Sequence, residues 1–346
     1  MGQEQEQKTL LDKTSEKLPM NCSNEAFKKA KRALVGSMLA LISGNLYVVI
    51  NIVMQVLKLD FLDAAFVRSV ILIHVVTILC YCNGLSLFPS GMDRKTKGFM
   101  MLQGLLGGVA TTLRFACVQL MPVGDATALI YSAPIFTMLF AWLLLKQRFG
   151  LFIVFKVTFA LLLMIGAILV TQPAFIFQQF STHPKTESET FGRLYQLGAL
   201  LGILTAVCRG LVNVSITICT EVHSLVCLWW SGFGLLLCAL FTVAFYSEAR
   251  IMHLQFDDVS FQDWMGHIGI ALTGLLAYFC GIKAFQMIDP TVVSSIRSVD
   301  IILAYVAQVV IMHQVPNYLA SIGACLIVLS GISIALQDFL SKNDQN

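Results

Sequence analysis

The chain has 346 residues, of which 57% are hydrophobic and 12% are charged, and its mean hydropathy is +0.78. Globular proteins carry about 25% charged residues, so this composition leaves too little polar surface to coat a soluble domain. The formal net charge is +3, and the charged residues cluster between apolar stretches instead of forming one basic face. This pattern excludes nucleic acid as the partner. The composition predicts an all-α polytopic protein in a lipid bilayer.

Apolar segments of about 20 residues, the length that crosses a bilayer as a helix, alternate with short polar gaps that hold most of the prolines. Pro134 alone lies inside an apolar segment, where it is either a hinge or a kink fixed by packing. We expect ten transmembrane helices, over residues 33–55, 65–81, 98–120, 126–145, 151–171, 196–219, 224–246, 264–284, 291–312 and 317–336.

Lysine and arginine placement predicts the orientation of these helices. Seven Lys and Arg residues precede the first segment, which makes the tail 1–32 cytosolic. With that choice 13 loop and tail cations are cytosolic and 4 are outside. The even number of spans then places both termini in the cytosol, with 173–195 as an outer loop and 338–346 as a cytosolic C-terminal tail.

An internal repeat divides the chain. Residues 125–150 read DATALIYSAPIFTMLFAWLLLKQRFG, and residues 289–316 read DPTVVSSIRSVDIILAYVAQVVIMHQVP. Both open with Asp-x-Thr, pass a Ser and a break residue, and continue as a bulky apolar helix. The chain is therefore predicted to hold two five-span repeats, 33–172 and 196–337. Because five is odd, the second repeat enters the membrane from the opposite side, as in many secondary transporters.

These repeats resemble a known family. The SAPIFTMLFAW stretch looks like the EamA repeat of the drug/metabolite transporter superfamily, and RSVDIILAYVAQ resembles the second EamA repeat of the G branch of solute carrier family 35. The resemblance implies a carrier with ten helices and a central cavity lined mainly by the third, fourth, eighth and ninth spans. Many members carry a Gly-Glu pair where this chain has Lys146-Gln147-Arg148 and His313-Gln314, so no role is transferred to those turns.

Cations inside the predicted spans are the main chemical signal. Each costs about 2.5–3.5 kcal/mol at a helix centre, so each needs a route to water, carbonyl partners, a wet cavity or an anionic ligand. Asp300 is the one carboxylate that we expect to oppose their positive charge. Arg68 and Lys156 lie near span ends and are expected to snorkel to the interface. The six cations are Arg68, Arg114, Lys156, Arg209, Lys283 and Arg297.

Three of these cations predict an anion site. Arg114, Lys283 and Arg297 lie on spans that the resemblance places around the cavity, where Arg forks and a Lys point charge suit carboxylates or phosphate. Arg297 and Lys283 would bind the anion, and Arg114 would guard or complete the site. Asp300, at i, i+3 from Arg297, either neutralises it, orients it or exchanges a proton.

Further polar residues leave two interpretations each. Arg209 near the middle of the sixth span either contributes to the site or bonds neighbouring carbonyls. The hydroxyls of Tyr131, Tyr278 and Tyr305 either donate to a ligand or belong to packed side chains. The Cys80-x-Cys82 pair has no neighbouring His or carboxylate, so we predict neither a metal site nor a cofactor.

Two other sequence features concern partners. Glu6, Leu10 and Leu11 fit an acidic dileucine signal for a sorting adaptor, which predicts cycling between the plasma membrane and endomembranes. The glycine patterns at 104–108 and 198–202 let helices approach closely, either within the bundle or in a homodimer.

Together these patterns predict a secondary transporter of a small organic anion, such as a di- or tricarboxylate, that works by alternating access. A nucleotide-sugar or related metabolite carrier is the alternative within transport, and a non-transporting regulatory or scaffold protein is the alternative outside it. No nucleophile motif such as G-x-S-x-G and no H-E-x-x-H motif occurs, so we do not expect an enzyme.

Overall fold

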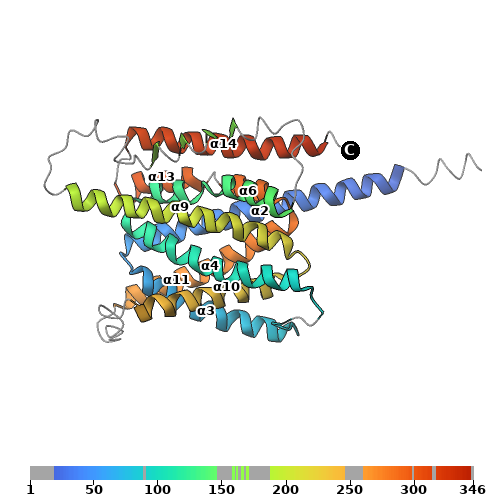
Figure 1. Cartoon of the computed structure of the whole chain (residues 1–346), viewed down its shortest axis with the longest axis horizontal. Coiled ribbons are helices and arrows are strands. Elements are labelled where there is room, and N and C mark those ends of the chain that lie inside the picture. The colour runs from blue at the N-terminus through green and yellow to red at the C-terminus, as the bar shows by residue number, and fades with distance from the viewer. Residues whose placement is uncertain are drawn as a thin grey trace, which may run out of the picture.

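A computed structural model describes residues 19–88, 91–145, 158–159, 161–162, 165–166, 169–170, 188–245, 260–297, 300–313 and 317–343. In these ranges the regular secondary structure is helical, and Figure 1 shows the long helices aligned side by side in one bundle. The helices are α2 (Pro19–Val56), α3 (Phe61–Cys82), α4 (Arg94–Leu120), α5 (Val123–Ile130), α6 (Ala133–Leu145), α9 (Ser188–Ile218), α10 (Ser224–Phe245), α11 (Phe261–Met287), α12 (Pro290–Arg297), α13 (Asp300–Val310) and α14 (Tyr318–Asn343).

Eight stretches of the described chain are long and apolar enough to cross a membrane, which confirms a polytopic helical protein. The apolar part of α14, Tyr318–Ser333, is shorter. Most of the predicted fifth span, 151–171, lies outside the described residues. The count of ten spans therefore stays a prediction. The eight stretches are Ala30–Val56, Phe61–Cys82, Arg94–Leu120, Val123–Leu145, Gly192–Ile218, Ser224–Thr242, Phe261–Met287 and Pro290–Val310.

The first helix begins earlier than hydropathy predicts. We expected a polar tail up to residue 32, but α2 begins at Pro19 and extends beyond the bundle in Figure 1. Ala, Lys and Arg in this segment are good helix formers, so the helix continues into the polar region although that part adds nothing to the apolar signal. Glu6, Leu10 and Leu11 lie outside the described residues.

The fourth and ninth spans are each built from two shorter helices. α5 ends at Ile130 and α6 begins at Ala133, so Pro134 lies in the first turn of α6 and not in the middle of a helix as predicted. The reason is geometric, because Pro134 has no N–H with which to reach the carbonyl of Ile130. The chain instead turns at Tyr131 and Ser132, where the Ser132 hydroxyl donates to the Leu129 carbonyl at 2.7 Å.

Helices from the two halves of the chain pack across each other. α4 packs against α9 and α10, and in the same way α11 packs against α2 and α3. Gly104 and Gly108 make the α4–α10 contact possible, since a Cβ at either position would collide with the backbone of Trp230 or Gly234. The glycine pattern at 104–108 thus serves packing within the bundle.

Hydrogen bonds link helix ends that the predicted topology puts on one side of the membrane. On the predicted cytosolic side, Arg32 donates from Nη2 to the carbonyl of Gln286 at 3.1 Å. On the opposite side, the N–H of Gly124 donates to Oε1 of Gln308 at 2.9 Å. These pairs agree with the alternating direction of the spans and do not depend on which side faces the cytosol.

Candidate functional site

Four buried arginines surround one tyrosine in the interior of the bundle. The Cζ atoms of Arg68, Arg114, Arg209 and Arg297 lie 5.6, 4.4, 5.3 and 5.2 Å from the ring centroid of Tyr47. None of the four arginines is more than 6% exposed, and Tyr47 is 1% exposed. The arginines come from α3, α4, α9 and α12. We call these five residues the arginine cluster.

The first span brings Tyr47 into the cluster through a polar stripe. Ser43, Tyr47, Asn51 and Gln55 are spaced by four residues, so they share one face of α2. Nε and Nη2 of Arg114 donate to Oδ1 of Asn51 at 3.1 and 3.0 Å, and Nη2 also donates to the Tyr47 carbonyl at 2.9 Å. Our sequence analysis did not single out Tyr47 or Asn51, although the stripe is a signal that could have identified them.

Arg68 does not snorkel. We expected its side chain to reach the membrane interface, but it is 2% exposed because it lies on the inward face of α3 beside Ala65 and Ser69. Its Nη2 donates to the carbonyl of Gly274 at 3.3 Å, and a Cβ at Gly274 would lie 2.5 Å from the Arg68 Cζ. Proximity to a helix end was a poor guide because the helix face, and not the depth, decides whether a side chain can reach water.

Arg209 and Arg297 each contact a second predicted tyrosine. The Cζ of Arg209 lies 5.8 Å from the ring centroid of Tyr278, and that of Arg297 lies 5.5 Å from the ring centroid of Tyr131. The Tyr131 hydroxyl donates to the Gly44 carbonyl at 3.4 Å. The structure therefore brings Arg114, Arg209, Arg297, Tyr131 and Tyr278 together.

Asp300 lies in the same interior region and is 1% exposed. A Cβ at Gly44 would collide with its carboxylate, so the glycine in α2 makes room for this side chain. Neither carboxylate oxygen accepts a hydrogen bond among the described residues. The simple i, i+3 neutralisation is not formed as a hydrogen bond, since α12 ends at Arg297 and α13 begins at Asp300.

Several polar atoms of the arginine cluster and of Asp300 have no hydrogen-bond partner among the described residues. Buried polar atoms are normally hydrogen-bonded. Several unpartnered polar atoms in one place therefore point to a polar ligand or water. Within the described chain, the atoms without a hydrogen-bond partner include the Tyr47 hydroxyl, Nε and Nη1 of Arg68, Nη2 of Arg209, Nε of Arg297 and both carboxylate oxygens of Asp300.

A small cavity adjoins the cluster. Its volume is about 20 Å³, which suffices for roughly one water molecule. Arg114, Arg209 and Arg297 line it, together with Tyr131 and Asn213. In this conformation an organic anion therefore cannot enter without movement of side chains or helices.

Lys283 is not part of the cluster. It is half-buried near the end of α11, close to His223 in the turn between α9 and α10. Partial burial and the charge of Lys283 lower the pKa of His223 below its ordinary value. Lys156, the remaining predicted cation, lies outside the described residues.

A second buried carboxylate was missed by the sequence analysis. Asp125 is 8% exposed, and its two oxygens accept hydrogen bonds from Tyr305 at 2.8 Å and from Tyr195 at 3.1 Å. We had treated Asp300 as the one carboxylate of the spans, but Asp125 lies within the Val123–Leu145 stretch. Its place at the start of the repeat was the available signal. Tyr305 is therefore engaged with Asp125.

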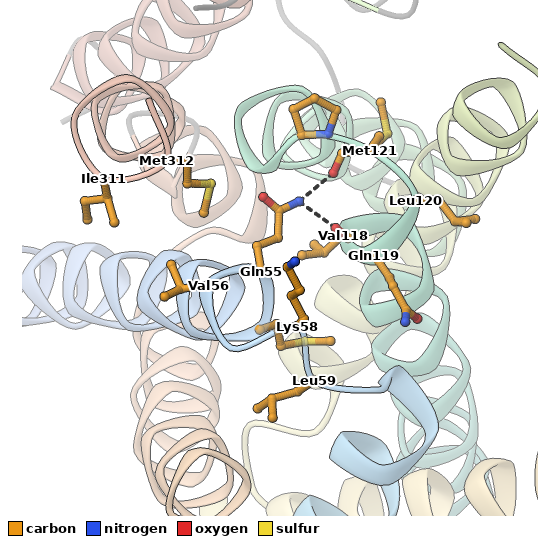
Figure 2. A pocket seen from close by; sticks show the side chains of 12 residues that line it. Gln55, Val56, Lys58, Leu59, Val118, Gln119, Leu120, Met121, Ile311 and Met312 are labelled. Carbon is orange, nitrogen blue, oxygen red and sulfur yellow. Dashed lines mark hydrogen bonds between the residues drawn. The ribbon is translucent and has the colours of Figure 1, made fainter. Parts of the chain in front are cut away.

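A larger pocket lies between the ends of α2, α4 and α13 (Figure 2). Its volume is about 540 Å³. Nε2 of Gln55 donates to the carbonyls of Val118 and Met121, both at 2.6 Å, and thereby ties α2 to the end of α4. The Ile311 and Met312 side chains lie across the pocket from this amide. The predicted topology places the pocket on the outer side.

The family follows from two matches along the chain. The model of the EamA-like transporter family matches residues 34–172 and 196–336. The chain belongs to the EamA-like transporter family. These ranges include all five residues of the arginine cluster.

Similar proteins include transporters and a solved structure. Solute carrier family 35 member G1 of Homo sapiens is 27% identical over 92% of this chain and 84% of its own length. The pseudopaline exporter CntI of Pseudomonas aeruginosa is 22% identical over 87% of this chain and 95% of its length. One crystal structure superposes with a TM-score of 0.58 at 18% identity, over 89% of this chain and 97% of that chain, which shows the fold alone.

Proposed function

We propose that this member of the EamA-like family is a secondary transporter of a small organic anion. The observation that carries the proposal is the convergence of four buried guanidinium groups in a region where Asp300 is the buried carboxylate that the structure describes. Guanidinium forks bind carboxylate and phosphate oxygens in pairs, and in a low-dielectric interior such bonds are strong. A bound anion would offset the surplus positive charge.

Three arginines of the cluster and Asp300 have proposed roles in binding. Arg297, Arg209 and Arg114 line the cavity and would bind the anion. Asp300 would orient Arg297 or exchange a proton. Lys283 lies apart from these residues, so we no longer include it in the site.

Alternating access fits the closed state of the site. The cavity of about 20 Å³ must open for an anion to enter, and the interrupted fourth and ninth spans supply places where helices can shift. The reciprocal packing of α4 and α11 supports two inverted five-helix repeats, because each central helix contacts the first two helices of the other half. We therefore propose ten spans in two repeats.

Two alternatives remain tied to the same fold. Nucleotide sugars also carry phosphate, and the relative named pseudopaline exporter supports export of an organic metabolite. A regulatory protein that inherited the carrier fold would keep the helices but would not move solute. Transport assays separate these alternatives.

The test is uptake by purified protein in proteoliposomes. The panel consists of succinate, tricarballylate, uridine monophosphate and a nucleotide sugar, each offered alone and as a competitor. Arg297→Ala should abolish saturable uptake, and Arg297→Lys should keep part of it because Lys retains the charge and loses the fork. Arg94→Ala removes an exposed arginine and is the matched control. Equal uptake by wild type and Arg297→Ala contradicts the proposed site. Inhibition by nucleotides alone favours the nucleotide-sugar hypothesis, and absence of any uptake favours the regulatory alternative.

Orientation has a separate test. We propose that both termini are cytosolic in the plasma membrane or an endomembrane, since 13 of 17 loop and tail cations fall on that side. An N-glycosylation acceptor engineered between Pro173 and Gly192 should be modified. Modification of an acceptor between Pro89 and Lys97 would show the opposite orientation.

The sorting signal at Glu6, Leu10 and Leu11 also has its own test. An unchanged distribution of the protein between the plasma membrane and endomembranes, after alanine replacement of both leucines, would refute it.

A further inference from the structure

The arginine cluster has an electrostatic problem when no anion is bound. Each cation buried inside a span is costly, and four of them close together repel one another. Asp300 can offset one of the four charges. The nearby cavity holds roughly one water, so solvent supplies little compensation. Some other group must keep the guanidinium groups together in the empty protein.

Tyr47 is the group that all four arginines share. Its ring centroid lies within 5.6 Å of each of the four Cζ atoms. Among the ring contacts of the described chain, Phe115 holds Arg68 at 5.7 Å, Tyr278 holds Arg209 and Tyr131 holds Arg297. Tyr47 is therefore the ring that all four arginines of the cluster share.

The electronic structure of the ring suits this role. The face of an aromatic ring carries negative potential, and cation–π contacts strengthen when water is removed. Tyr47 is 1% exposed, and its backbone is fixed because its carbonyl accepts from Nη2 of Arg114. One rigid ring on α2 thereby connects α3, α4, α9 and α12, which belong to both halves of the chain.

We infer that Tyr47 is a positioning residue that holds the four guanidinium groups together when no anion is bound, so that the empty carrier can close and return. This inference rests on the proposed function. A bound anion carries full negative charge and takes over the compensation, so the loaded carrier needs the ring much less. Tyr47 should therefore matter for the return of the empty carrier and little for exchange of one bound anion for another.

The experiment compares two transport modes in proteoliposomes with labelled succinate, or with whichever anion of the panel wild type transports. Net uptake into vesicles without internal anion requires the empty carrier to return, whereas exchange against saturating internal anion does not. Tyr47→Leu should lower net uptake by about tenfold or more, corresponding to loss of at least one strong cation–π contact, and should leave exchange within about threefold. Tyr47→Phe should restore net uptake because it keeps the ring. Tyr81→Leu, at a tyrosine 86% exposed on α3, is the control for removing a tyrosine.

A second variant separates the electronic effect of the ring from a folding defect in Tyr47→Leu. Replacing Tyr47 with 3,4,5-trifluorophenylalanine keeps nearly the shape of phenylalanine and weakens the negative face. Net uptake should fall relative to Tyr47→Phe, while exchange stays the same. Equal losses in both modes, or no difference between phenylalanine and its fluorinated form, would overturn the inference. If wild type transports no anion of the panel, the proposed function fails as well, and that result is distinct from an active wild type with insensitive variants.

Discussion

Two buried carboxylates in this protein have opposite surroundings. Asp125 accepts hydrogen bonds from Tyr195 and Tyr305, which tie α5 to α9 and α13. Asp300 accepts none among the described residues and lies in the region of the arginine cluster. A carboxylate whose two oxygens both accept hydrogen bonds holds helices in place, whereas one without hydrogen-bond donors near surplus cations can respond when a ligand or proton arrives. Burial of charge in a span therefore does not by itself mark a transport site.

The largest effect is expected when a cation is removed from the region of Asp300. Arg114→Ala should lower uptake by about 100-fold or more, equivalent to about 2.7 kcal/mol, because it removes a charge and also leaves Asn51 Oδ1 and the Tyr47 carbonyl without their donor. Proteoliposome uptake measures the effect, with Arg94→Ala as the control. Uptake within threefold of wild type would show that Arg114 is structural.

Replacing the unbonded carboxylate should change affinity more than stability. Asp300→Asn removes the one negative charge set against the cluster, so anions should bind more tightly, with KM lower by about tenfold and slower turnover because release is harder. Concentration dependence of uptake separates the two effects. An unchanged KM would show that the Asp300 charge does not oppose anion binding, and a raised KM would favour the role in which Asp300 orients Arg297.

Replacing Asp125, the hydrogen-bonded carboxylate, should change stability more than affinity. Asp125→Asn weakens both tyrosine hydrogen bonds and should cost about 1–3 kcal/mol of stability, which lowers Tm by a few degrees, with KM unchanged. Thermal unfolding of purified protein measures the loss, and Tyr195→Phe combined with Tyr305→Phe should reproduce it. A change in KM as large as that of Asp300→Asn would show that Asp125 also affects anion binding and is not only structural.

The smallest effect is expected at the cation outside both regions. Lys283→Ala should leave KM and the rate of uptake within about twofold of wild type, because a half-buried charge beside His223 is screened by solvent. The same uptake assay tests this. A loss comparable to that of Arg297→Ala would restore Lys283 to the site.

Much of the architecture could be read from the chain. Hydropathy located the eight described spans to within a few residues, except where polar helix formers carried α2 back to Pro19. Intramembrane charge identified Arg114, Arg209, Arg297 and Asp300 as residues of interest, because charge in an apolar run needs an explanation whatever the fold. The helix break before Pro134 was harder to place, since a proline is compatible with either a kink or a new first turn.

The sequence by itself determined that this protein is a bundle of membrane helices with an excess of cations inside its apolar segments, because span length and charge are properties of the chain alone. Only the tertiary structure decided which cations meet. It turned Arg68 inward, set Lys283 apart and gathered four arginines from four helices around Tyr47. The physical reason is that a side chain's partners depend on helix rotation and on contacts between distant segments, which hydropathy along one segment does not encode.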